Sequence, residues 1–172
     1  MTLYTLAYEM ITRSSNFATN VLIDYLDAEK VTSTMRDLGA DSIEVLRGVE
    51  DLKAFRQGLS NSTTAIDLLV IFEQLASDTL VNEHANKEMI SILKDQKHND
   101  MISAKLPEGT AVAHKTGWIT GVHHDSGIVY TNEDKGEGYI LIFLSKNAPD
   151  REAVLNTSAD ISKLLFDHTT TN

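Results

Sequence analysis

Two short groups of polar residues have types and spacing that suit the binding and turnover of a small anionic substrate. The first group is Lys115-Thr116-Gly117, which we expect at the end of a strand that begins near residue 111. There the lysine would attract a substrate carboxylate, the threonine hydroxyl would hydrogen-bond to it, and the glycine would let the substrate lie against the strand edge. The same tripeptide is also common where a strand leads into a turn, so alone it does not decide the function.

The second group is Ser14-Ser15-Asn16, which lies in a short polar break between two predicted helices. Ser14 and Asn16 are two residues apart, so both side chains could project into one cleft. A serine there can relay a proton, and an asparagine can bind a substrate amide. The alternative is a helix N-cap, in which one of the three residues only satisfies free N–H groups of the helix that begins near Phe17.

The first 108 residues carry apolar residues at helical spacing. Helices are predicted over residues 3–11, 17–25, 31–38, 65–75 and 82–95. The helix that opens at residues 63–65 is apolar nearly all round, so we expect it to be the most buried. Residues 47–62 are polar and contain glycine, which predicts a long ordered loop.

After residue 108 the apolar pattern changes to strands. Residues 111–114, 126–130 and 139–144 are β-rich runs bounded by turn residues, and residues 132–138 would form the tip of an antiparallel hairpin. A helix over residues 150–166 would cover one face of this sheet. We therefore predict a helical lobe over residues 1–108 and a sheet with a C-terminal helix over residues 109–172, together one α/β (more strictly α+β) domain.

Composition excludes several classes of function. The chain has 172 residues, of which 42% are hydrophobic and 23% charged, enough for one domain with a core. The 25 acidic residues exceed the 15 basic ones, so a net charge of -10 disfavours nucleic acid as a partner. No apolar stretch approaches the roughly 20 residues of a membrane span. The first residues contain no basic leader, so we expect no targeting segment within the chain.

Cysteine is absent from the chain, which excludes disulfides and thiolate metal sites. A metal site built on His123, His124 and Asp125 is also disfavoured. On a strand only His123 and Asp125 would point to the same face, and no third ligand has a recognisable spacing. We therefore expect neither a metal nor another cofactor.

Together the two polar groups resemble the second and third motifs of the penicillin-recognising serine hydrolases. The run from Met10 to Asn20 is similar to the class A β-lactamase form of the second motif, with Ser15 where the family usually has aspartate. Residues 62–65 are similar to the threonine-rich helix start that follows the family's omega loop. The resemblance implies a serine hydrolase of the β-lactamase and transpeptidase type, which opens β-lactam or D-alanyl amide bonds by acyl transfer to serine.

The resemblance also implies a role for each matching residue. Ser14 would pass a proton to the leaving nitrogen, and Asn16 would hold the substrate side-chain amide. Lys115 and Thr116 would bind the substrate carboxylate beside Gly117.

Three further residues are assigned with less support from the motifs. Glu50 follows Arg47 by three positions, whereas the family's deacylating glutamate follows its arginine by two. Glu50 is therefore a candidate for the deacylating base. Trp118 and His123 are predicted to line the edge of the cleft, although Trp118 could instead pack in the turn.

The largest departure from the family is the nucleophile. No Ser-x-x-Lys precedes Ser14, and the sequence has no match for the family's N-terminal helix, first two strands or nucleophile helix. The sequence thus resembles an N-terminally truncated family member that is inactive alone. The alternative is a non-catalytic binding or regulatory module that keeps the cleft.

Loss of the nucleophile helix should expose an apolar trough. The expected partners are therefore a missing N-terminal segment or a second copy of the chain, besides the small substrate. The family resemblance implies a periplasmic or exported protein, which the chain itself does not reveal. Ser91 and Lys94 do fit the Ser-x-x-Lys spacing, but they lie between the two motifs, so we interpret them as part of an amphipathic helix.

Overall fold

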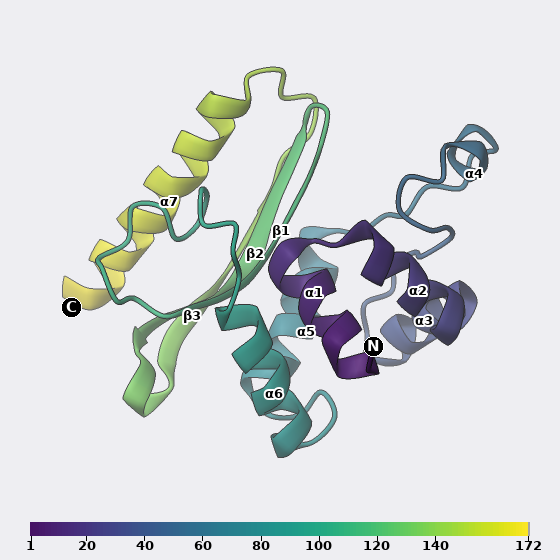
Figure 1. Cartoon of the computed structure of the whole chain (residues 1–172). Coiled ribbons are helices and arrows are strands. Elements are labelled where there is room, and N and C mark those ends of the chain that lie inside the picture. Colours follow the sequence, from purple (N-terminus) through teal and green to yellow (C-terminus); the bar gives the residue numbers. More distant parts are fainter. Residues whose placement is uncertain (172) are drawn as a thin grey trace.

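The computed structural model describes residues 1–171 (Figure 1). Its elements, in chain order, are α1 (Leu3–Arg13), α2 (Asn16–Leu26), α3 (Ala28–Asp37), α4 (Leu52–Arg56), α5 (Ala65–Ala76), α6 (Glu83–Lys94), β1 (Val112–Ile119), β2 (Val122–Asn132), the 3-10 helix η1 (Glu133–Lys135), β3 (Glu137–Leu144) and α7 (Arg151–Thr171). The predicted α+β fold is confirmed. The division near residue 108 would fall in the connection between α6 and β1, and its status as a boundary between lobes stays a prediction.

The three strands form one antiparallel sheet in the order β1-β2-β3. In the β1–β2 pair, Thr116 lies opposite Asp125 and Trp118 opposite His123. A β-bulge between Tyr130 and Asn132 precedes the hairpin tip. The register therefore places residues 116–118 directly beside residues 123–125.

Helices cover both faces of the sheet. Figure 1 shows α7 lying across one face, while α5 and α6 lie on the other. The core on the α5 and α6 side consists of Phe72, Leu75, Leu93, Ala113 and Ile128. A second core, formed by Ile102, Val112 and Val129 with Phe166, lies on the α7 side. Burial on both faces fixes the strand register, since a slip of one residue would turn every core side chain to the wrong face.

The start of α5 is held by a capping box. Asp67 accepts hydrogen bonds from the Thr64 hydroxyl at 2.6 Å and from the backbone N–H of Thr64 and of Ser42, both at 3.1 Å. In return, the Thr64 side chain accepts from the Asp67 N–H at 3.2 Å. The buried carboxylate thus joins the helix start to the loop after α3, and these donors lower its pKa.

The strands and the last helix are longer than predicted. Strand β1 continues to Ile119, so the lysine motif lies within the strand and not at its end. The turn falls at residues 120–121, where Gly121 adopts a φ of 73°. Helix α7 continues through the threonine-rich tail to Thr171, and the predicted loop over residues 47–62 contains the short helix α4.

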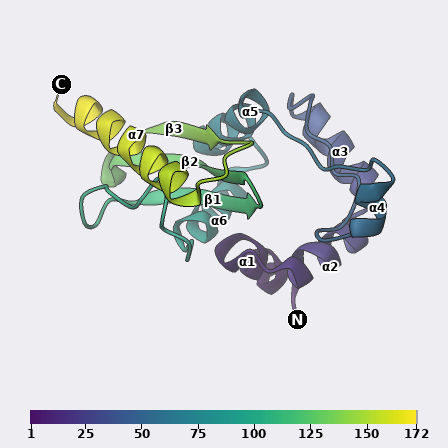
Figure 2. The ribbon, with the colours of Figure 1, turned by 90° about the horizontal axis from the view of Figure 1, so that it is seen from above.

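Residues 65–75 are predicted to form the most buried helix, and α5 is only partly buried, with three buried residues, as many as in α6. Phe72 and Leu75 of α5 face the core, but Ile66 is 68% exposed and Leu69 is 38% exposed. Because α5 is apolar nearly all round, both of its sides would have to be packed against other residues to be buried. The described residues 1–171 bury only part of its apolar surface. Figure 2 shows α5 and α6 beside the sheet and α2, α3 and α4 on the side away from it.

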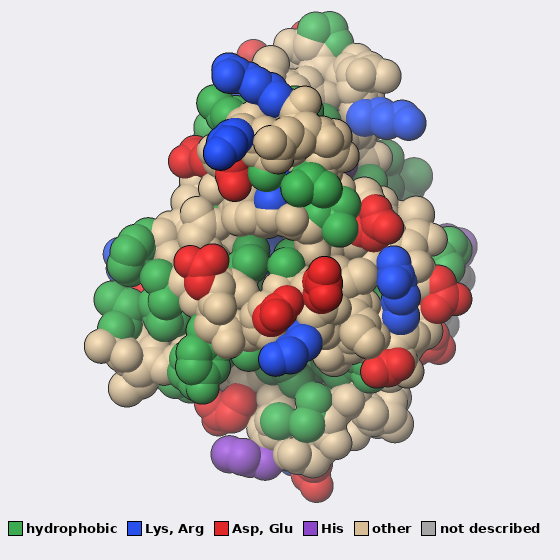
Figure 3. Space-filling model, turned by 90° about the vertical axis from the view of Figure 1, so that its right-hand side faces the viewer, with side chains coloured by type: hydrophobic (Ala, Val, Ile, Leu, Met, Phe, Trp, Pro, Cys, Tyr) green, Lys and Arg blue, Asp and Glu red, His purple; other side chains and the backbone are tan. Residues whose placement is uncertain are grey.

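Charge is scattered over the surface on the α2, α3 and α4 side. In Figure 3 lysine and arginine side chains lie singly among acidic ones and form no continuous basic patch on this face. Within residues 1–171, no helix is both long enough and apolar enough to cross a membrane. This face offers no electrostatic footprint for a nucleic acid.

Candidate active site

In the break between α1 and α2, Ser15 caps a helix and Ser14 has its side chain free for chemistry. Ser14 ends α1 in the left-handed conformation, with φ 53° and ψ 41°, and its N–H group bonds to the Glu9 carbonyl. Ser15 is the N-cap of α2, and its hydroxyl accepts from the Ala18 N–H at 3.3 Å. The capping alternative therefore applies to Ser15, which leaves the Ser14 side chain free of the cap. Asn16 is the exposed first residue of α2.

Lys115 joins the two polar groups. Its Nζ donates to the Ser14 Oγ at 2.5 Å and also bonds to the Thr116 carbonyl. Burial lowers the pKa of the Lys115 ammonium from 10.5 to about 8, and the Asp125 carboxylate acts weakly in the opposite direction. No carboxylate forms an ion pair with Lys115 among residues 1–171, so its charge is available to an external anion.

Thr116 lies on the opposite face of β1 from Lys115, because side chains alternate along a strand. Thr116, Gly117, Trp118 and His123 line a small pocket of about 40 Å³ on the α7 side. This volume is far smaller than the roughly 300–1,000 Å³ of typical small-molecule sites. Thr116 and His123 are buried, whereas Trp118 is 72% exposed and so does not pack in the turn. The structure thus gathers these four residues, and only Lys115 reaches Ser14.

Glu50 stands apart from these residues. It is exposed, adopts a φ of 63°, and has no hydrogen bond or ion pair to Ser14 or Lys115 within the described chain. The residue before it is firmly held, because Asn20 accepts from the Val49 N–H at 2.6 Å and donates to the Val49 carbonyl at 3.1 Å. The loop is therefore fixed to α2 next to Glu50, and the role of Glu50 stays a prediction.

A buried polar network behind the lysine motif was missed in the sequence. His114 Nδ1 lies 2.8 Å from Asp125 Oδ1, and His114 Nε2 lies 3.0 Å from Asn99 Oδ1. His114 is 1% exposed and Asp125 is fully buried. Gly127 makes room for the histidine, since a Cβ there would lie 2.5 Å from the His114 Cβ. The available signal was strand alternation, which places residues 114, 116, 123 and 125 on one face.

The Ser91 and Lys94 pair does not resemble an activated nucleophile. Lys94 Nζ lies 2.7 Å from Glu133 Oε1 and 4.4 Å from the centroid of the Tyr130 ring. Ser91 is exposed on α6. Lys94 is thus engaged by Glu133 and Tyr130, and among residues 1–171 it forms no hydrogen bond to Ser91. Among residues 1–171, no group of three or more potential ligands is placed to hold a metal ion.

Comparison with known proteins decides the family. The family model described as "Beta-lactamase enzyme family" matches residues 1–169. The chain belongs to this β-lactamase enzyme family. No curated protein sequence matches the chain.

Solved structures of this β-lactamase fold superpose on the whole chain. The structure of PBP-A has a TM-score of 0.89 at 22% sequence identity and covers 100% of this chain, which covers 63% of PBP-A. The β-lactamase from Sphaerobacter thermophilus DSM 20745 has a TM-score of 0.89 at 25% identity, again over 100% of this chain and 65% of its own. A class A β-lactamase from Bacteroides cellulosilyticus DSM 14838 has a TM-score of 0.86 at 21% identity, over 100% and 65%. This chain thus spans less than two thirds of the length of these proteins.

Proposed function

We propose that this chain forms the substrate-binding and proton-relay part of a serine hydrolase that opens β-lactam or D-alanyl amide bonds. The observation that carries the proposal is the 2.5 Å contact between Ser14 Oγ and Lys115 Nζ. This contact joins two motifs that lie far apart in the sequence. The Lys115 ammonium is partly buried and forms no ion pair with a carboxylate among residues 1–171. A mutant of PBP-A, which shares the fold, forms an acyl-enzyme complex with penicillin G, so a penicillin is the natural probe.

In this proposal Lys115 attracts the substrate carboxylate from within the cleft. In the complete hydrolase Ser14 passes its hydroxyl proton to the leaving nitrogen and regains the proton that the attacking serine releases, while Asn16 holds the substrate amide. Gly117 leaves the strand edge open, because no heavy atom lies within 4 Å of a Cβ built there. Trp118, which is exposed near the end of β1, lines the edge of the cleft, whereas Thr116 and His123 are buried on the α7 side, away from Lys115. Glu50 activates the deacylating water.

The acyl-forming serine is not supplied by this chain. Ser14 accepts a hydrogen bond from an ammonium, which cannot take its proton while charged. The other serine with a lysine at the right spacing, Ser91, is next to an ion-paired lysine. The chain therefore binds β-lactams without acylation. The alternative function is a purely binding or regulatory module. The surroundings of Ser14 and Ser91 favour it as well, because neither serine is placed to attack a substrate.

Equilibrium binding of penicillin G tests the proposal. By calorimetry at pH 7, we expect Lys115→Ala to weaken binding about 10-fold to 100-fold, because a hydrogen bond to a charged group contributes roughly 1.5–3 kcal/mol. Lys146→Ala is the matched control, since Lys146 is exposed on the connection between β3 and α7. Equal affinity of wild type and Lys115→Ala, or no binding by the wild type, would contradict the proposal.

A further inference from the structure

The connection between α6 and β1 contacts both elements that carry the site. Gln96, at its start, is only 4% exposed although its side chain is an amide. Its Nε2 group donates to the Ile11 carbonyl at 2.9 Å and to the His114 carbonyl at 3.4 Å. Ile11 belongs to the last turn of α1, just before Ser14, and the His114 carbonyl belongs to the peptide that leads into Lys115. One amide group therefore spans the two chain segments that carry Ser14 and Lys115.

The orientation of this amide is fixed by its own segment. Gln96 Oε1 accepts from the N–H of Lys97 at 3.0 Å and from the N–H of His98 at 3.1 Å. The NH₂ group must therefore face the two carbonyls. The Lys97 N–H also donates to the Thr12 carbonyl at 3.0 Å, which adds a second link to the end of α1.

The other end of the segment is tied to the sheet by the buried histidine network. Asp125 Oδ2 accepts from the Ile102 N–H at 3.0 Å, while its Oδ1 faces His114. Asn99 donates through Nδ2 to the Gln96 carbonyl at 3.1 Å, so its Oδ1 faces His114 Nε2. Both ring nitrogens of His114 thus lie within hydrogen-bond distance of an oxygen atom.

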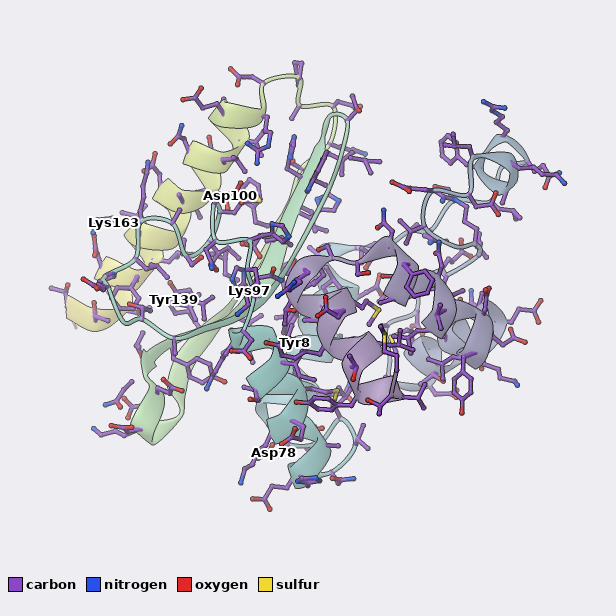
Figure 4. The ribbon with its side chains drawn as sticks, viewed as in Figure 1. Tyr8, Asp78, Lys97, Asp100, Tyr139 and Lys163 are labelled. Atoms are coloured by element: carbon purple, nitrogen blue, oxygen red, sulfur yellow. The ribbon has the colours of Figure 1, made fainter. Side chains whose placement is uncertain are left out.

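Figure 4 shows Lys97 and Asp100 on this connection, between α6 and the sheet, with Tyr8 of α1 near the end of α6. The Tyr8 hydroxyl donates to Asp95 Oδ2 at 3.0 Å, directly before Gln96. Residues 95–102 thus contact α1 at one end and β1 and β2 at the other. This segment is held rigidly, because its buried polar atoms are hydrogen-bonded and breaking any of these bonds would cost free energy.

We propose that Gln96 is a positioning residue, whose buried amide fixes the separation between Ser14 and Lys115. The inference rests on the proposed function of these two residues. An apolar side chain of the same size would fill the volume, but it would leave two carbonyls without donors. The ends of α1 and β1 would then move apart, and Lys115 would gain water.

The test compares Gln96→Met with the matched control Gln74→Met. Gln74 also donates from Nε2 to a backbone carbonyl, that of Leu38 at 2.7 Å, between α5 and the end of α3. Both substitutions keep the length of the side chain but remove one glutamine amide. Because each leaves a backbone carbonyl without its donor, both should lower the free energy of unfolding. The readout is the pKa of Lys115, followed by NMR titration of its side-chain carbon resonance in the ligand-free protein.

We expect the Lys115 pKa to rise from about 8 toward 10.5 in Gln96→Met and to stay at the wild-type value in Gln74→Met. If Gln96→Met does not fold, Gln96→Asn is measured, because it keeps the amide but is one methylene too short to reach both carbonyls. An unchanged Lys115 pKa in the Gln96 variant would overturn the inference. A shift of the same size in the control would also overturn it. Neither outcome depends on penicillin binding, so failure here is distinct from failure of the proposed function.

Discussion

The Lys115 ammonium donates to the Ser14 hydroxyl, although the two residues are 101 positions apart in the sequence. Because the Ser14 oxygen accepts this bond, its own proton points away from the lysine. A hydroxyl held in this way can give its proton to a group in the cleft, while the neighbouring ammonium attracts an anion. The contact between Ser14 and Lys115 therefore suits both roles proposed for the pair, which are proton relay by Ser14 and carboxylate binding by Lys115.

The first prediction concerns the pH dependence of penicillin binding. Burial holds the Lys115 pKa at about 8, so the ammonium is present below pH 8 and is lost as the pH rises. A bound carboxylate favours the charged form, so binding at pH 8 should take up a fraction of a proton. We expect affinity to fall steadily above pH 8 and to be level between pH 6 and 7. Calorimetry in two buffers of different ionisation enthalpy measures the proton uptake, and an affinity that does not change from pH 7 to 10 would contradict it.

The second prediction compares two glycines of the sheet. A Cβ at Gly127 would lie 2.3 Å from the Ala113 carbonyl oxygen, whereas a Cβ at Gly117 meets nothing within 4 Å. Gly127→Ala should therefore lower the free energy of unfolding by roughly 2–4 kcal/mol or prevent folding. Gly117→Ala should fold with wild-type stability and bind penicillin more weakly, because the new methyl group stands at the strand edge. Urea unfolding and calorimetry check both, and similar stability of the two variants would be inconsistent with this register.

The third prediction concerns the loop that carries Glu50. Asn20→Ala removes both hydrogen bonds to the Val49 backbone. We expect the Val49 amide to exchange with solvent about fivefold faster or more, since a hydrogen bond of this kind contributes roughly 1 kcal/mol or more. Amides of the sheet core, such as that of Val129, are the internal reference. Hydrogen exchange by NMR measures both, and unchanged protection at Val49 would show that other contacts hold the loop.

The fourth prediction concerns acid stability. Hydrogen bonds from Thr64 and Ser42 lower the pKa of buried Asp67 below its ordinary 3.8. A carboxyl with a depressed folded-state pKa stabilises the fold above its unfolded pKa, and this contribution is lost as the pH falls through the folded value. Asp67→Ala should therefore cost about 2–3 kcal/mol at pH 7 and less at pH 2. The free energy of unfolding, measured in urea at both pH values, tests this, and an equal cost at both would argue against a charged cap.

The sequence predicts the order of the elements well because their apolar periods are clear. Leu6 and Met10 mark the buried face of α1, and the β-rich run at residues 139–144 marks β3. The end of β1 was placed too early, because Lys115, Thr116 and Gly117 are polar or small and break the apolar alternation. Backbone pairing with β2, and not side-chain burial, carries the strand through them.

The polar network was only partly accessible from the sequence. Strand alternation places His114 and Asp125 on one face of the sheet, but nothing in the sequence shows that Asn99, from the connection before β1, meets them. The motif residues Ser14 and Lys115 were found because they belong to patterns that resemble a known family. Gln96 has no such pattern, and its importance comes from the two carbonyls that it reaches in space.

Covalent capture of penicillin G tests the account most directly. Intact-mass spectrometry is applied to this chain and to a version extended at its N-terminus by a segment containing Ser-x-x-Lys from a family member. We expect no added mass on the chain itself at pH 7, because the lysine beside Ser14 is mainly an ammonium below its pKa of about 8 and the lysine near Ser91 is ion-paired, and one acyl mass on the extended protein. Lys115→Ala in the extended protein should slow that reaction. An acyl mass on the unextended chain, mapped to any serine, would contradict the account.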